Sequence, residues 1–171
     1  SPKRSECHTS GSSFLPPSKA CQYPNKGGSW AVFGDSHGVE LAFELSKQLD
    51  QYDDGLTHLT FSGCEPSFRI NDPTSFCDEW TEQSIDILVH TENIQNIVIK
   101  YAYNFHLFDD HRVEYPGHNP NFCEPYKKIA FGSCKNYHEH SWNNLKELIF
   151  FLAQKKENIF LVLQTPELPN D

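Results

Sequence analysis

The sequence contains no methionine, and it is poor in positive charge. Its 14 Lys and Arg residues are outnumbered by 23 Asp and Glu residues, which gives a net charge of −9 at pH 7. Nucleic acids and anionic membrane surfaces attract faces rich in Lys and Arg, so this balance argues against both as partners. Because even an initiator methionine is missing, we expect the natural chain to begin upstream of Ser1.

Long apolar runs are missing as well. No segment approaches the ~20 consecutive apolar residues that a membrane-spanning helix needs. There is also no Asn-x-Ser/Thr sequon, so glycosylation gives no information about the compartment. The chain of 171 residues fits one domain, and a domain of that size buries roughly 70% of the surface of its unfolded chain. The composition therefore predicts a single packed domain.

Six cysteines stand out against these absences. They permit many disulfide pairings, and the sequence alone does not select one. They nevertheless fall into three local couples, which are Cys7 with Cys21, Cys64 with Cys77, and Cys123 with Cys134. Each couple would close a short loop, which is worth about 3 kcal/mol in the chain-entropy model. Such bridges persist in oxidising compartments, so the couples favour an extracytoplasmic location over free thiols in the cytosol.

A zinc site is a second interpretation of the last two cysteines. Cys123, Cys134, His138 and His140 together supply sulfur and nitrogen ligands. However, these cysteines lie eleven residues apart, whereas structural zinc sites usually separate paired cysteines by only about two to four residues. The spacing favours a disulfide, and we expect no metal.

The hydrophobic pattern alternates between the periods of strands and helices. Short apolar runs predict strands over 30–33, 97–99 and 159–163, and 56–61, stopped by Ser62-Gly63, is predicted as a further strand. Helical spacing predicts helices over 39–49, 79–91 and 141–156. Residues 1–29 lack periodicity, and we expect a disulfide-tied lead-in without regular elements. Residues 104–140 are expected to form a long loop. This order predicts an α/β fold over 30–171, a flavodoxin-like three-layer sandwich with a parallel sheet.

Candidate catalytic residues follow the first three predicted strands. Ser36 opens the first helix, where unpaired N–H groups and the helix dipole stabilise an oxyanion. Gly63 follows the second strand and offers an unobstructed backbone N–H, and Asn104 follows the third and offers a side-chain amide. We therefore predict Ser36 as a nucleophile, with an oxyanion hole built from the N–H groups of Ser36 and Gly63 and from Asn104. The plainer interpretation of Asp35 and Ser36 is a helix cap.

These residues also carry a resemblance. Phe33-Gly34-Asp35-Ser36-His37 resembles the first block of the SGNH (GDSL-type) hydrolases, and Gly63 and Asn104 match that family's glycine and asparagine. The form Gly-Asp-Ser-His, followed by Ser-Gly-Cys-Glu-Pro and a later Cys77, looks closer to the SGNH domain fused to membrane-bound acyltransferase type 3 proteins. The resemblance covers about residues 30–165.

The resemblance implies the SGNH hydrolase fold and a serine esterase or O-acyltransferase without a cofactor. Such proteins move acyl groups, often acetyl, onto carbohydrate outside the cytosol. The expected partners are an acyl donor, a carbohydrate acceptor and an acyltransferase membrane domain in the same parent protein, which would tether this domain to a membrane. Asp35 and His37 are expected to contact substrate.

Two features depart from the family pattern. The third block is usually Gly-x-Asn-Asp, whereas here Asn104 stands within Tyr-Ala-Tyr-Asn-Phe. The family's base belongs to an Asp-x-x-His motif that follows a fifth strand, and this sequence stops after the fourth predicted strand. We therefore expect a domain without its C-terminal strand and helix, and a base beyond Asp171. His111, His138 and His140 are the internal alternatives for the base.

Other functions fit parts of the sequence. A catalytically degenerate SGNH-fold module could bind carbohydrate or a partner through aromatic residues at and after the third strand, namely Tyr101, Tyr103, Phe105, Phe108, Tyr115, Phe122 and Tyr126. Gly34-x-Ser36-x-Gly38 formally fits the nucleophile elbow of α/β-hydrolases, but it follows the first strand and lacks a preceding His-Gly-Gly-Gly segment. A flavodoxin-like nucleotide binder lacks the glycine-rich phosphate motif.

Overall fold

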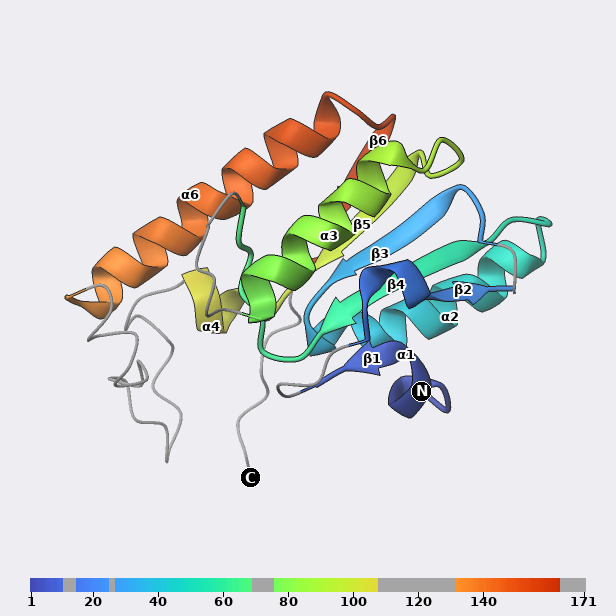
Figure 1. The fold of residues 1–171 in the computed structure, drawn as a ribbon, viewed down its shortest axis with the longest axis horizontal. Coiled ribbons are helices and arrows are strands. Elements are labelled where there is room, and N and C mark those ends of the chain that lie inside the picture. Colours follow the sequence, from blue (N-terminus) through green and yellow to red (C-terminus); the bar gives the residue numbers. More distant parts are fainter. Residues whose placement is uncertain (11–14, 25–26, 69–75, 108–131, 164–171) are drawn as a thin grey trace.

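The computed structural model describes residues 1–10, 15–24, 27–68, 76–107 and 132–163. Its elements in chain order are α1 (Arg4–Cys7), β1 (His8–Thr9), the 3-10 helix η1 (Pro17–Lys19), β2 (Cys21–Tyr23), β3 (Trp30–Gly34), the 3-10 helix η2 (Ser36–Gly38), α2 (Val39–Asp50), β4 (Leu56–Phe61), α3 (Phe76–His90), β5 (Asn96–Lys100), α4 (Tyr103–Leu107), α6 (Cys134–Ala153) and β6 (Asn158–Leu161). From β3 onward, strands alternate with helices (Figure 1), as the hydrophobic pattern predicted.

The strands of the described residues form one sheet in the order β1-β4-β3-β5-β6. These neighbours pair in parallel, and β2 pairs with β4 in the antiparallel sense. Gly34 at the end of β3 lies opposite Thr60 of β4 and Lys100 of β5. The carboxyl ends of the three central strands therefore meet at one edge, which is where ligands bind in sheets of this kind.

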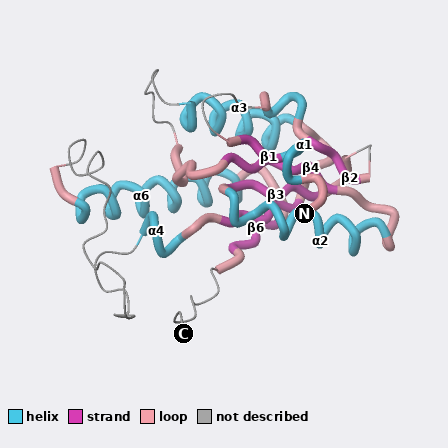
Figure 2. Tube along the Cα trace, turned by 90° about the horizontal axis from the view of Figure 1, so that it is seen from below, coloured by secondary structure: helices cyan, strands magenta, loops and turns pink. Residues whose placement is uncertain are grey.

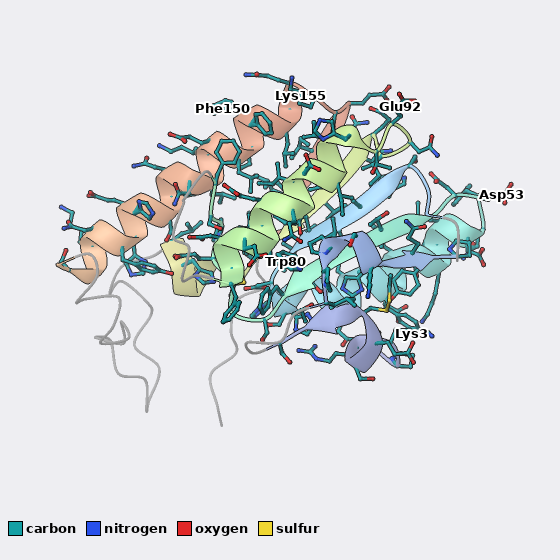
Figure 3. The ribbon with its side chains drawn as sticks, in the orientation of Figure 1. Lys3, Asp53, Trp80, Glu92, Phe150 and Lys155 are labelled. Carbon is teal, nitrogen blue, oxygen red and sulfur yellow. A yellow bond between two sulfur atoms is a disulfide. The ribbon has the colours of Figure 1, made fainter. Side chains whose placement is uncertain are left out.

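Helices cover both faces of the sheet. Successive strand residues point to opposite faces, so Val32 packs in the cluster with α2, whereas Phe33 packs in the cluster with α3 and α6. Figure 2 shows α2 and α3 on opposite sides of the strands. Trp80, labelled on α3 in Figure 3, stacks on Phe33 and meets Phe61 edge-on, which fixes α3 over β3 and β4. The predicted three-layer α/β sandwich is confirmed.

The prediction that residues 1–29 form no regular element is wrong. This segment contributes β1 and β2, which both lie along the outer side of β4. A disulfide between Cys7 and Cys21 joins the end of α1 to the start of β2. Strands of two and three residues are too short to show a hydrophobic period, because their pairing with β4 rather than their own pattern makes them strands.

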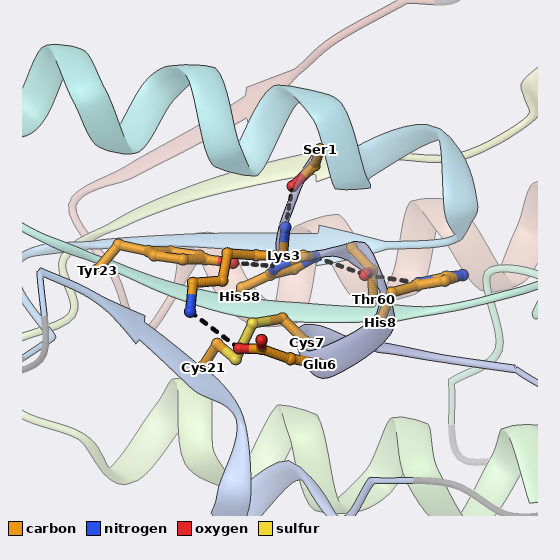
Figure 4. Close-up of a disulfide and its surroundings, with 9 residues drawn as sticks. All are labelled: Ser1, Lys3, Glu6, Cys7, His8, Cys21, Tyr23, His58 and Thr60. Carbon is orange, nitrogen blue, oxygen red and sulfur yellow. Dashed lines mark hydrogen bonds and ion pairs between the residues drawn. A yellow bond between two sulfur atoms is a disulfide. The ribbon is translucent and has the colours of Figure 1, made fainter.

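A chain of hydrogen bonds runs along one face of β4 and joins it to β1 and β2 (Figure 4). Tyr23 Oη lies 3.3 Å from His58 Nδ1, and His58 Nε2 lies 2.6 Å from Thr60 Oγ1. Thr60 Oγ1 in turn lies 2.9 Å from Nδ1 of His8. His58 is buried, and burial, assisted by the nearby His8, lowers its pKa to about 4. The His58 ring is therefore neutral at pH 7.

The second disulfide joins Cys64, just after β4, to Cys77 in the first turn of α3. Both bridges are couples that the sequence predicted. The third couple includes Cys123, which lies outside the described residues.

Among the helices that the structure describes, none combines the length and the apolar character needed to span a bilayer.

The long loop predicted over 104–140 is wrong at both ends. α4 occupies its beginning, and α6 starts at Cys134, with the Ser133 hydroxyl accepting a hydrogen bond from the Asn136 N–H as the cap. The first turns of α6 are polar apart from the buried Tyr137, so they carry too few apolar residues to show a helical period. His138 and His140 consequently lie on a helix.

Candidate functional site

The turn after β3 places Ser36 at the start of a helix. Gly34 ends β3 with a φ of 154°, and a Cβ at this residue would lie 1.8 Å from the carbonyl oxygen of Lys100. Only glycine therefore allows β3 to approach β5 so closely. Ser36 is the first residue of η2, which runs directly into α2. This helix start stands at the carboxyl edge of the sheet, with the N–H groups of His37 and Gly38 bonded to Asp35.

Asp35 ties the turn between β3 and η2 to the end of β5. Its Oδ1 accepts a hydrogen bond from the backbone N–H of His37 at 2.8 Å, and its Oδ2 accepts one from the backbone N–H of Ala102 at 2.8 Å. The side chain is only 2% exposed. Burial would raise the pKa of Asp35, but the nearby His106 ring and the hydrogen bonds from the Ala102 and His37 N–H groups outweigh it and hold the pKa below its ordinary value. The helix-cap interpretation is correct for Asp35.

His37 is the more exposed of the two residues predicted to contact substrate. Its side chain is 44% exposed, and its Nδ1 lies 3.2 Å from Oδ1 of Asp35. The carboxylate thus fixes the orientation of an imidazole that adjoins Ser36 in the chain. Asp35 itself is buried and already has protein partners on both oxygens.

The other predicted oxyanion donors follow the neighbouring strands. Gly63 comes after β4 with a φ of 72°, and no described atom lies within 4 Å of the position that a Cβ would take. Asn104 lies in α4, directly after β5. Because β4 and β5 flank β3, the chain brings Ser36, Gly63 and Asn104 to the ends of three adjacent strands.

Lys100 and His106 are buried titratable residues at this edge that the sequence pattern did not single out. Lys100 ends β5, its Nζ donates to the carbonyl oxygen of Leu163 at 2.8 Å, and burial lowers its pKa although Asp35 opposes this shift. His106 of α4 is 1% exposed, and its Nε2 lies 3.8 Å from Oδ2 of Asp35. One lysine at the end of an apolar strand, or one histidine among several, carries no periodic signal that would single it out.

The aromatic residues that the sequence offered for carbohydrate binding are partly buried in the core and partly outside the residues with described side chains. Tyr101 and Tyr103 are buried in the core, so they do not offer rings to a sugar. The remaining aromatic candidates, together with His111 and Cys123, lie outside the residues whose side chains the structure describes.

His138 Nδ1 donates to the carbonyl oxygen of His106 at 2.9 Å, which gives this histidine a structural contact. Within the described ranges no group of three or more His, Cys, Asp or Glu suits a metal ion, and the zinc alternative includes the undescribed Cys123.

Comparison with known families agrees with this arrangement. A family profile described as SGNH domain (fused to AT3 domains) matches residues 6–171. The chain belongs to this family. The match begins inside the N-terminal segment and therefore includes β1 and β2 of the SGNH domain. Searches among curated proteins and among solved structures found no match.

Membership gives the SGNH domain a general function and fits its chemistry. It supports a hydrolase or acyl-transfer domain in the broad sense, which agrees with a serine at a helix start beside three strand ends. The disulfides Cys7–Cys21 and Cys64–Cys77 fit an oxidising, extracytoplasmic compartment.

Proposed function

We propose that this SGNH domain is an extracytoplasmic serine esterase or O-acyltransferase that forms an acyl-enzyme on Ser36. The expected substrates are acyl esters of carbohydrate, with acetyl as the acyl group. One observation carries the proposal, which is that Ser36 opens the helix after β3 while Gly63 and Asn104 follow the two strands that flank β3. That arrangement supplies a nucleophile and several donors at the same edge of the sheet.

The reaction has two halves. Ser36 Oγ attacks the carbonyl carbon of the ester and gives its proton to a histidine supplied from outside the described residues. The carbonyl oxygen becomes an oxyanion, held by the N–H groups of Ser36 and Gly63 and by the amide of Asn104. The alcohol leaves with the proton from that histidine, and the acyl group stays on Ser36. Water or a sugar hydroxyl then attacks the acyl-enzyme by the same steps and restores Ser36.

The neighbours of Ser36 have positioning and contact roles in this scheme. We assign Asp35 to holding the turn, because its carboxylate is buried and bonded to backbone N–H groups. We assign the substrate contact to His37, which is oriented by Asp35 and partly exposed. The family's fusion to AT3 domains supports an acyltransferase membrane domain in the same parent protein as the tether and as the source of the acyl group.

Turnover of a small acetyl ester tests the proposal. The intact protein is compared with Ser36→Ala and with the control Ser46→Ala, whose hydroxyl merely donates to the Phe43 carbonyl oxygen within α2. We expect the wild type and the control to release acetate, and Ser36→Ala to lose turnover by at least about a thousandfold. Equal turnover by a folded Ser36→Ala variant would show the proposal to be wrong. Sugar binding without turnover in all three proteins would favour the degenerate binding module.

A further inference from the structure

His106 is held from two sides. On one side its Nε2 faces Oδ2 of Asp35 at 3.8 Å. On the other side its Nδ1 lies 2.9 Å from Tyr137 Oη, and its backbone carbonyl oxygen accepts a hydrogen bond from Nδ1 of His138 at 2.9 Å. Tyr137 and His138 are consecutive residues of α6. The residue therefore links the turn between β3 and η2 to α6 through α4.

The chemistry of the partners gives each ring nitrogen a distinct task. An ionised carboxylate only accepts hydrogen bonds, so the nitrogen that faces Asp35, Nε2, carries a proton. The other nitrogen, Nδ1, lies at hydrogen-bond distance from the Tyr137 hydroxyl, a group that can donate or accept. Only a side chain with polar groups on two opposite sides serves both partners, and His106 does so while 1% exposed.

Asn104 shares a short helix with this histidine. α4 spans only Tyr103–Leu107, so Asn104 stands two residues before His106 in the same five-residue element. The backbone just before α4 is bound to Asp35 through the Ala102 N–H. Any movement of His106 would be transmitted to Asn104 through this one turn of helix.

We propose that His106 is a positioning residue that sets the placement of Asn104 relative to Ser36, by bridging Asp35 and α6. The inference rests on the proposed function, because Asn104 matters only if it stabilises an oxyanion on the acyl carbon. A displacement of about 1 Å in a catalytic group is enough to cost about a hundredfold in rate. An oxyanion donor acts in the transition state, so its misplacement lowers kcat rather than raising KM.

The test uses His106→Leu and His106→Gln in the intact protein. Leucine removes both polar contacts, whereas glutamine keeps an amide that donates toward Asp35. We expect His106→Leu to lower kcat by about 10- to 100-fold with KM nearly unchanged, and His106→Gln to recover part of the loss. The matched control is His90→Gln, because His90 also pairs with a carboxylate, Asp86 at 2.9 Å, but on the exposed surface of α3.

A double-mutant cycle separates positioning from a general structural role. If His106 acts through Asn104, then adding His106→Leu to Asn104→Ala costs less than about threefold more in kcat. A full multiplicative loss in the double variant would overturn the inference, as would a wild-type kcat in folded His106→Leu. A lowered Tm with unchanged kcat also counts against it.

Ser36→Ala, measured in the same series, distinguishes a failure of the proposed function from a failure of the role proposed for His106. Full activity of Ser36→Ala refutes the proposed function itself. Loss in Ser36→Ala together with full activity in folded His106→Leu refutes only the role of His106. The rate at which a fluorophosphonate probe labels Ser36 gives a second readout, because negative charge also develops on the phosphoryl oxygen when Ser36 attacks phosphorus. We expect His106→Leu to slow this labelling by the same factor as kcat.

Discussion

Asp35 accepts a hydrogen bond from the backbone N–H of Ala102 at 2.8 Å, across the boundary between β3 and β5. The same carboxylate caps the helix that begins at Ser36. One buried anion thereby holds both the turn that leads to Ser36 and the segment that leads to Asn104. We therefore expect the geometry of the site to depend on this contact.

Replacing Asp35 by Asn tests that dependence. The amide has one accepting oxygen, so its NH2 group would meet either the His37 or the Ala102 N–H, and a buried donor would lose its partner. We expect the free energy of unfolding to fall by about 1–3 kcal/mol and turnover to fall with it. Urea unfolding and ester turnover measure the two effects. Asp50→Asn, at the exposed end of α2, is the control and should change neither.

Gly34 and Gly63 should differ in how well they tolerate replacement by alanine. Gly34→Ala would place a methyl group 1.8 Å from the Lys100 carbonyl oxygen, so β3 and β5 must separate. We expect a loss of about 3 kcal/mol in the free energy of unfolding, or failure to fold. Gly63→Ala meets no described atom within 4 Å and carries only the cost of a φ of 72°, about 1 kcal/mol. Chemical denaturation distinguishes them, and equal losses would contradict this account.

Stability should depend on His58 in mild acid. The folded pKa of about 4 lies below the ordinary histidine value of 6.5, so protonation favours the unfolded chain as the pH falls. The contribution is fully present above pH 6.5 and is lost as the pH falls toward 4, a change of about 3 kcal/mol. His8, whose pKa is also lowered by burial, adds to the same slope. The charge of Glu40 partly opposes the lowering of the His58 pKa.

Unfolding measured between pH 7 and pH 4 checks this prediction. His58→Gln removes the titrating group but keeps an amide near Thr60 and Tyr23, so its stability should vary less with pH than that of the wild type. The exposed pair of His90 and Asp86 provides the comparison, and His90→Gln should keep the wild-type slope. An unchanged slope in His58→Gln would show that another group causes the acid sensitivity.

The two disulfides should contribute to different properties. Cys7–Cys21 fastens the N-terminal segment beside β4, and Cys64–Cys77 closes the segment that follows Gly63. Replacing either pair by serines should cost about 3 kcal/mol of stability. Only the loss of Cys64–Cys77 should also lower kcat, because it loosens the chain beside a predicted oxyanion donor. Unfolding curves and ester turnover of the two double variants check this, and equal effects on kcat would contradict it.

Much of the central fold was readable from the sequence, because β3 and β5 are apolar runs, β4 carries Leu and Phe and stops at Ser62-Gly63, and α2 and α3 have clear helical spacing. The site residues could be placed at strand ends for the same reason. What the sequence did not show was structure created by tertiary contact. β1 and β2 exist through pairing with β4, and the polar first turns of α6 are fixed by contacts such as that between Tyr137 and His106.

Identification of the residue that carries the acyl group tests the central claim most directly. The intact protein is mixed with an activated acetyl ester, quenched in acid during turnover, digested and analysed by peptide mass spectrometry, beside Ser36→Ala. The assignment of Ser36 as the nucleophile predicts an acetyl group on the peptide that contains Ser36 and its absence from the variant. Acetylation of a different residue during turnover, or turnover by Ser36→Ala, would contradict it.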